Sequence, residues 1–120
     1  MPSSQPPDTF PPLGRDAVLV LLALASGPLH GYGLIRDVAE RSSGETVLQT
    51  GALYRTLRRL LRDLLIEECA PPPGDTGDDR RRYYRLTRRG HLALDAEVDR
   101  MARLVKAARL AHAGKRPRLI

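Results

Sequence analysis

Four arginines lie close together near the middle of the chain, and they carry its strongest chemical signal. They are Arg55, Arg58, Arg59 and Arg62. If residues 51–63 form a helix, a rotation of about 100° per residue places all four within an arc of roughly 100°. Guanidinium groups form paired hydrogen bonds with guanine edges, and their charge displaces counterions from phosphates. The pattern fits a helix that reads duplex DNA, although a solvated amphipathic face would have the same spacing.

The opposite side of the same segment is apolar. Leu53, Leu57, Leu60 and Leu64 recur at intervals of four, three and four residues. This spacing places them on one narrow stripe of a helix. The segment is therefore predicted to bury one face in a core and to present its arginines to a ligand.

The start of this helix adds further candidates for DNA contact. Thr50 is the expected N-cap first and a phosphate ligand second. The backbone amide of Gly51 lies where a helix N-terminus favours a phosphate. Tyr54 falls between the two faces, so it contacts DNA or packs where the first and third helices meet. Arg55 is expected to reach base edges, whereas Arg62 is expected to reach phosphate or solvent.

Length and composition restrict the class of protein. The 120 residues suffice for one modest core, and the net charge of +6 favours an acidic partner such as nucleic acid. The longest apolar run, residues 17–25, is shorter than the roughly 20 residues of a membrane-spanning helix. A cleaved signal peptide is disfavoured because Asp16 abuts this run and residues 1–14 carry no basic residue. A cytoplasmic protein without membrane contact is the expected class.

No arrangement of residues predicts catalysis or a metal site. His30, His91 and His112 do not form a metal-binding spacing with one another or with Cys69. His30 is expected to cap a helix or to be a satisfied core residue, and Cys69 to be a buried small hydrophobe. No nucleophile–base pair, Gly-rich phosphate loop or paired carboxylates stand out. We expect no enzyme activity, no cofactor and no bound metal.

The elements that position these residues can be placed from periodicity and turn signals. Residues 1–14 form a Pro-rich arm that is expected to be disordered, and residues 114–120 form a basic tail. Between them the sequence predicts helices over 15–26, 31–41, 51–63 and 88–112, with Thr87 as N-cap of the last, and strands over 66–70 and 81–86. The fold class is mostly α with a small β-hairpin. Residues 15–86 are predicted to form a winged helix-turn-helix domain and residues 87–113 a long C-terminal dimerisation helix.

The last helix carries an apolar seam. Leu94, Val98, Met101, Val105 and Ala108 repeat at intervals of four and three residues, as in a coiled coil. The seam either docks back on its own domain or pairs with a second copy. A small domain leaves so long a helix little to pack against, so a homodimer is favoured. The predicted interface comprises Leu94, Val98, Met101, Leu104, Val105 and Ala108.

Three short motifs, in this order and spacing, resemble the PadR family of bacterial transcriptional regulators. They are His30-Gly31-Tyr32, Gly51-Ala52-Leu53-Tyr54, and Arg82-Tyr83-Tyr84-Arg85-Leu86-Thr87 followed by Gly90. The resemblance covers about residues 15–112. It implies a winged-helix homodimer that reads DNA with its third helix and wing. It further implies a repressor of nearby genes, released in many relatives by a small aromatic or lipophilic effector.

The sequence departs from the family pattern at the third helix and the wing. The family commonly ends the third helix with Gly where this chain has Leu64. Because Leu takes the left-handed conformation only at a cost, the junction is expected to be built differently. The wing tip carries Asp75, Asp78 and Asp79, which duplex DNA would repel. Contact by the wing is therefore expected from Arg80, Arg81 and Arg82 at its base.

The resemblance also bears on the effector: some relatives in that family stack planar ligands between tryptophans near the dimer seam. This chain contains no Trp, which disfavours such an aromatic sandwich. An aliphatic pocket between the first helix and the last, or the absence of an effector, both stay open. The predicted function is sequence-specific binding of double-stranded DNA at a near-palindromic operator by a homodimer. The alternatives are a non-specific RNA- or DNA-binding protein and a winged-helix adaptor for other proteins.

Overall fold

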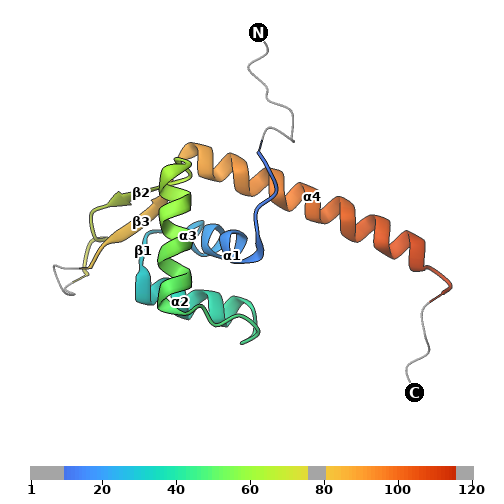
Figure 1. Cartoon of the computed structure of the whole chain (residues 1–120), viewed down its shortest axis with the longest axis horizontal. Helices are drawn as coiled ribbons and strands as arrows, with labels where there is room; N and C mark the ends of the chain where they lie inside the picture. The colour runs from blue at the N-terminus through green and yellow to red at the C-terminus, as the bar shows by residue number, and fades with distance from the viewer. Residues whose placement is uncertain (1–9, 76–80, 116–120) are drawn as a thin grey trace, which may run out of the picture.

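Three short helices and a small sheet form a domain from which one long helix extends (Figure 1). The computed structural model describes residues 10–75 and 81–115. The elements are α1 (Arg15–Leu24), β1 (Leu29–His30), α2 (Gly31–Arg41), α3 (Thr50–Arg62), β2 (Ile66–Cys69), β3 (Tyr83–Leu86) and α4 (Arg88–His112). This mostly helical winged architecture confirms the predicted fold class.

The sheet has three antiparallel strands in the order β1-β3-β2, not the two expected. β1 pairs Leu29 with Tyr84 and His30 with Tyr83. Sequence reasoning missed β1 because two residues are too few to show the alternation of a strand. The added strand ties the start of α2 directly to the wing.

The core lies where α1, α2, α3 and the inner face of the sheet meet, and the first half of α4 packs against it. Val20 and Leu21 of α1 are fully buried, as the apolar composition of that helix predicts. Leu53, Leu57 and Leu60 of α3 are buried, which confirms three positions of the predicted stripe. The fourth position was wrong: the chain turns after α3, and Leu64 is 67% exposed.

The junction between α3 and β2 corrects a second expectation. Leu64 adopts the left-handed conformation, with a φ of 61°. Its N–H donates to the Leu61 carbonyl oxygen at 3.0 Å, and the Leu65 N–H donates to the Leu60 carbonyl oxygen at 2.9 Å. These two bonds define a Schellman C-cap, the motif that glycine favours. The turn is therefore the one that Gly would make, and hydrogen bonds and packing around it offset the strain of Leu64.

The start of α4 is fixed against this junction. Thr87 caps α4 as predicted, because its Oγ1 accepts a hydrogen bond from the Gly90 N–H at 3.0 Å. The same hydroxyl donates to the Leu64 carbonyl oxygen at 2.6 Å, and the Thr87 N–H donates to that of Leu65 at 3.1 Å. A Cβ at Gly90 would collide with the Leu65 carbonyl oxygen. Only glycine lets the two backbones approach so closely.

Residues 10–13, here called the strap, cross the first half of α4. Phe10 is 8% exposed, and the Arg89 guanidinium lies 5.1 Å from its ring centroid. The Leu13 N–H donates to Glu97 Oε1 at 3.0 Å, and Arg100 Nη2 donates to the Pro11 carbonyl oxygen at 3.4 Å. The end of the expected disordered arm is therefore packed on the domain. The other residues of that arm, 1–9, and most of the tail, 116–120, lie outside the described residues.

Candidate nucleic-acid interface

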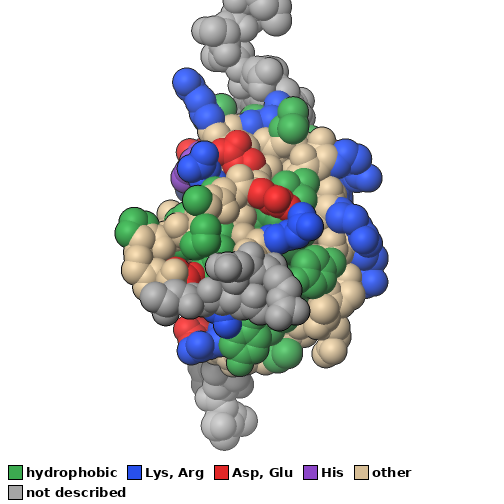
Figure 2. All heavy atoms as spheres, turned by 90° about the vertical axis from the view of Figure 1, so that its left-hand side faces the viewer, with side chains coloured by type: hydrophobic (Ala, Val, Ile, Leu, Met, Phe, Trp, Pro, Cys, Tyr) green, Lys and Arg blue, Asp and Glu red, His purple; other side chains and the backbone are tan. Residues whose placement is uncertain are grey.

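The arginines of α3 lie on its solvent side, opposite the buried leucines. Arg55, Arg58, Arg59 and Arg62 are all exposed. Within residues 10–75 and 81–115, no carboxylate lies within ion-pair distance of the first three, whereas Arg62 Nε lies 3.8 Å from Asp63 Oδ1. Figure 2 shows Lys and Arg side chains gathered along its right-hand edge. This edge is the face of the molecule that is turned toward the viewer in Figure 1, where α3 lies in front. The helix thus offers a row of guanidiniums to an acidic partner.

The first turn of α3 has free backbone donors, but its cap differs from the prediction. The N-cap is Gln49, whose side chain makes no capping hydrogen bond, and Thr50 is the first helical residue. The Thr50 cap was therefore wrong by one position. Thr50 and Gly51 are exposed, so their amides stay accessible for a phosphate.

Tyr54 is 45% exposed and lies beside the start of α2. Its hydroxyl oxygen lies 3.1 Å from the place that a Cβ would occupy at Gly31. The side chain therefore packs on α2, while its exposed part stays free for a ligand. Tyr54 was expected either to contact DNA or to pack where α1 and α3 meet. It does pack on a neighbouring helix, but that helix is α2.

The base of the wing carries arginines that are paired with acids. Arg82 Nη1 donates to Glu68 Oε1 at 2.9 Å, and Arg85 Nε donates to Glu67 Oε2 at 2.8 Å. Arg81 is exposed, and Arg80, Asp78 and Asp79 lie outside the described residues. Sequence reasoning missed both pairs. Because the tip of the hairpin is long, the sequence does not define how β2 is aligned with β3, and so does not show that Glu67 lies opposite Arg85.

His30 joins the wing to α2, which confirms its role as a cap. Its Nδ1 accepts a hydrogen bond from the Gly33 N–H at 3.1 Å. Its ring meets that of Tyr83 edge to face, with the centroids 5.2 Å apart. Burial, followed by the nearby charge of Arg81, lowers the pKa of His30, and the charge of Asp75 opposes this shift. The neutral imidazole that the Nδ1 acceptor requires is therefore favoured.

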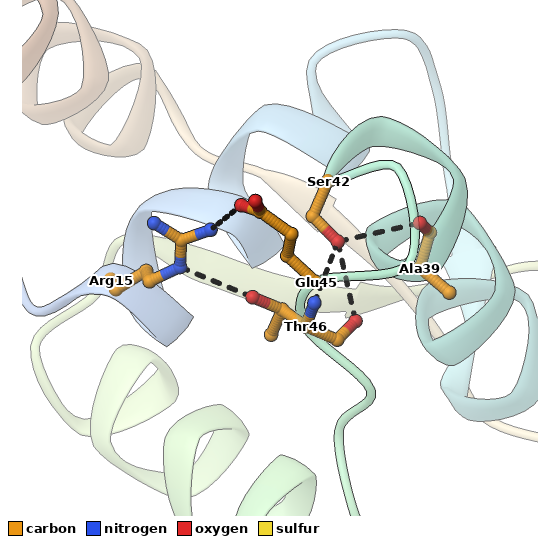
Figure 3. A network of polar contacts seen from close by, with 5 residues as sticks. All are labelled: Arg15, Ala39, Ser42, Glu45 and Thr46. Carbon is orange, nitrogen blue, oxygen red and sulfur yellow. Dashed lines mark hydrogen bonds and ion pairs between the residues drawn. The ribbon is translucent and has the colours of Figure 1, made fainter.

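The turn between α2 and α3 is held by a polar network (Figure 3). Ser42 Oγ accepts a hydrogen bond from the Thr46 N–H at 2.9 Å and lies 3.3 Å from the Ala39 carbonyl oxygen. Arg15 of α1 reaches across, donating from Nε to Thr46 Oγ1 at 3.1 Å and from Nη2 to Glu45 Oε2 at 3.4 Å. These bonds fix the direction in which α3 leaves the turn.

Beside this turn lies a groove of about 610 Å³ between α1 and α4. Val18, Leu19 and Leu22 supply apolar lining from α1, and Met101 supplies it from α4. Arg15, Ser42 and Glu45 contribute polar groups to the same groove, and none of the described residues that line it is aromatic.

The two halves of α4 differ in their surroundings. Leu94 is buried within the domain, so this member of the predicted seam packs inside its own protomer. Val98, Met101, Leu104 and Val105 are exposed, and so is every described residue from 101 to 115. The first half of α4 does dock on its own domain, while the second half presents an apolar seam to solvent.

The lone cysteine lies on β2. Burial, with a contribution from Glu67 and against that of Arg85, raises the pKa of the partly buried Cys69 thiol. Across residues 10–75 and 81–115, no group of three or more His, Cys, Asp or Glu side chains is arranged to hold a metal ion. None of the helices described is both long and apolar enough to span a membrane.

Comparison with known proteins agrees with this geometry. Residues 19–96 match the PadR-like family of transcriptional regulators. A PadR family transcription regulator from hypervirulent Clostridium difficile is 25% identical, with a TM-score of 0.66 over 83% of this chain and 99% of that one. A PadR-like transcription factor from Bacteroides fragilis is 23% identical, with a TM-score of 0.65 over 79% and 87% of the two chains.

A curated relative is similar in sequence over a shorter part of its own length. An uncharacterized 37.1 kDa protein in transposon TN4556 of Streptomyces fradiae is 42% identical over 87 residues, which cover 72% of this chain and 23% of that protein. The family match covers more than half of the chain, from within α1 through the wing to the first part of α4. The chain belongs to the PadR-like family of transcriptional regulators.

Proposed function

We propose that this chain is a sequence-specific DNA-binding repressor that acts as a homodimer. The observation that carries the proposal is the face of α3, where exposed arginines lie opposite buried leucines in a winged helix-turn-helix. In such domains the recognition helix enters the major groove and contacts base edges from its N-terminal residues. Family membership supports DNA-binding regulation rather than catalysis.

The proposed contacts divide by distance from the start of α3. Arg55 and Arg58 read base edges, and Arg59 binds phosphate or a base at the rim of the groove. The amides of Thr50 and Gly51 and the side chain of Tyr54 hold a phosphate at the helix N-terminus. The wing adds phosphate contacts through Arg81 and Arg82; Arg80, which lies outside the described residues, is expected to act with them.

The exposed half of α4 supports the homodimer. A stable interface usually buries about 800 Å² per partner, and the apolar residues of the seam from Val98 to Ala108 are exposed in the single chain. Pairing two copies through α4 would present two α3 helices to the same duplex. Two half-sites about 34 Å apart, related by a two-fold axis, would then form a near-palindromic operator.

The groove beside the α2–α3 turn supports release by a small lipophilic effector. Its aliphatic lining suits an apolar molecule, and Arg15 belongs both to the groove and to the network that fixes the turn. A ligand in the groove would therefore contact Arg15 and could displace the α2–α3 turn, which sets the direction of α3. Isothermal titration of the apo dimer with aliphatic and aromatic probes, with Leu22→Arg as the blocked variant, tests this part of the proposal.

Fluorescence anisotropy with duplex from the chain's own upstream region, against scrambled duplex at two salt concentrations, tests the main proposal. A preference of about a thousandfold, with strong salt dependence, is the result for a specific regulator. Arg55→Ala and Arg58→Ala should each cost about 1–3 kcal/mol of operator binding. Arg109→Ala, on the exposed end of α4, is the control of equal charge.

Two other outcomes favour other functions. Equal, salt-sensitive binding to both duplexes indicates a non-specific nucleic-acid-binding protein. The absence of salt-dependent affinity for DNA indicates a winged-helix adaptor, for which the acidic residues of the wing are the supporting observation. Unchanged affinity in both α3 variants would refute the assignment of α3 as the recognition helix.

A further inference from the structure

Two ion pairs cross the strands of the wing, and they lie on opposite faces of the sheet. Glu67 opposes Arg85 in the β2–β3 register, and Glu68 opposes Tyr84. Because neighbouring side chains of a strand point to opposite faces, Glu67 and Glu68 reach their arginines on different sides of the wing. Arg82, two residues before Tyr84, lies on the same face as Glu68.

The face with Glu68 and Arg82 is the one turned toward α3. Tyr84 on this face is buried in the core with Ile66 and Leu86, the residues that pack near α3. Strand β2 contacts α3 directly. In agreement with this placement, burial, followed by the charges of Glu68 and Tyr54, raises the pKa of Tyr84 against the opposing charge of Arg82. The inner pair therefore lies on the face of the sheet that packs against α3.

The other pair lies on the outer face. Tyr83, its neighbour on β3, packs edge to face on His30 at the start of α2. Glu67 and Arg85 are thus separated from the α3 face by the thickness of the sheet. The two pairs have nearly the same length, 2.8 Å and 2.9 Å, and similar exposure, so they differ chiefly in where they point.

We propose that Glu68 competes with DNA phosphate for Arg82. A guanidinium fork matches a carboxylate and a phosphate in the same way, so the two acids compete for one set of N–H donors. The side chains of Arg82 and Glu68 are 71% and 49% exposed, so a duplex phosphate can reach the arginine without unfolding the wing. The proposal rests on the proposed function, because it assigns a partner to the wing of that same DNA-binding surface.

The consequence is that the wing arginine adds less to affinity than a free arginine would. A duplex must first displace the carboxylate, which then stays close to the incoming phosphate and repels it. Glu68→Gln removes the competitor and should tighten binding about twofold to fivefold, the factor that corresponds to an exposed ion pair. To the extent that Glu68 keeps Arg82 off the phosphate in the wild type, Glu68→Gln should also steepen the slope of log K against log salt, by at most about 0.9. Phosphate contacts carry no sequence information, so operator and scrambled duplex should gain equally.

The experiment is anisotropy titration of the full chain with both duplexes at several salt concentrations. Glu67→Gln is the matched control, because it removes the same charge from the adjacent residue on the opposite face. Arg82→Ala, alone and combined with Glu68→Gln, tests whether the effect of Glu68 passes through the arginine. Urea titration of each variant checks that the fold is retained. We expect it to be retained, because both pairs are exposed.

The proposal expects a larger gain and a steeper salt slope for Glu68→Gln than for Glu67→Gln, with no such excess in the Arg82→Ala background. Equal effects of the two Gln variants would overturn it, because net charge alone would then account for the gain. So would a gain from Glu68→Gln that persists without Arg82. If the wild-type chain binds neither duplex at any salt concentration, the proposed function itself fails, and this inference fails with it.

Discussion

Replacing Gly90 by Ala should destabilise the protein, although Ala is the better helix former by about 1 kcal/mol. The added Cβ would collide with the backbone carbonyl oxygen of Leu65. Because the obstacle is backbone, it cannot rotate away as a flexible side chain could. Helix α4 must therefore move away from the junction that follows α3.

The expected magnitude follows from the contacts that such a movement disturbs. Overpacking a tight contact costs about 1–3 kcal/mol. The movement also weakens the bonds from Thr87 to the carbonyl oxygens of Leu64 and Leu65, each of which contributes about 0.5–1.5 kcal/mol. After the gain in helix propensity is subtracted, Gly90→Ala should lower the free energy of unfolding by about 1–5 kcal/mol.

Urea unfolding followed by circular dichroism at a fixed protein concentration measures this change, since association would otherwise shift the midpoint. Gly51→Ala is the matched control, because a Cβ there meets only Arg55 Nη1, at 3.5 Å. The control should leave stability unchanged or raise it by up to about 1 kcal/mol. A Gly90→Ala variant as stable as the wild type would refute the close approach of α4 to the Leu65 carbonyl.

Three further predictions concern α4, the strap and the α3–β2 turn. Val98→Arg combined with Val105→Arg should give a monomer in sedimentation analysis, and a persisting dimer would exclude the seam as the interface. Burial alone would raise the pKa of Glu97, but hydrogen bonds from the Leu13 N–H and Arg100, together with the charge of Arg100, lower it below the ordinary value of 4.5. The folded state therefore binds the proton on Glu97 less tightly than the unfolded state does. The stabilisation from this carboxylate is complete above about pH 4.5 and is lost as the pH falls through the folded pKa. In Glu97→Gln, the free energy of unfolding measured in acid titrations should therefore depend less steeply on pH in that range. Leu64→Gly should be more stable than Leu64→Ala by about 0.5–1 kcal/mol in urea titrations, because only Gly adopts a φ of 61° without strain.

The sequence predicted those features whose signal is local and periodic. The apolar stripe of α3 and the Thr87 cap of α4 depend on side-chain types at fixed offsets, and both are found in the structure. The strap was missed because Phe10 stands among prolines, and its packing depends on Arg89, which lies far away in sequence. β1 was missed because a two-residue strand has no period of its own.

The turn at Leu64 was mispredicted for a different reason. The local preference of Leu against the left-handed conformation is real, at about 1–2 kcal/mol. Two backbone hydrogen bonds of the C-cap, the bond from Thr87 and the burial of Leu65 oppose it. These contacts thus outweigh the preference of Leu against the left-handed conformation. Sequence reasoning can take account of that preference but not of the contacts that oppose it. For the candidate site, sequence placed the arginines on one face but could not show that Arg82 is already paired.

The anchoring of α4 determines how the reading surface relates to a second copy. At its start, Thr87 and Gly90 hold the helix on the turn that ends α3. Near its middle, Glu97 and Arg100 are bonded to the strap, at the place where the exposed seam begins. A helix fixed at both places transmits its direction rigidly, so in the proposed dimer the distance between two α3 helices would follow from these contacts rather than from the seam alone. A change at Gly90 would then alter the preferred spacing of operator half-sites, whereas a change at Arg55 would alter the preferred bases and leave that spacing the same.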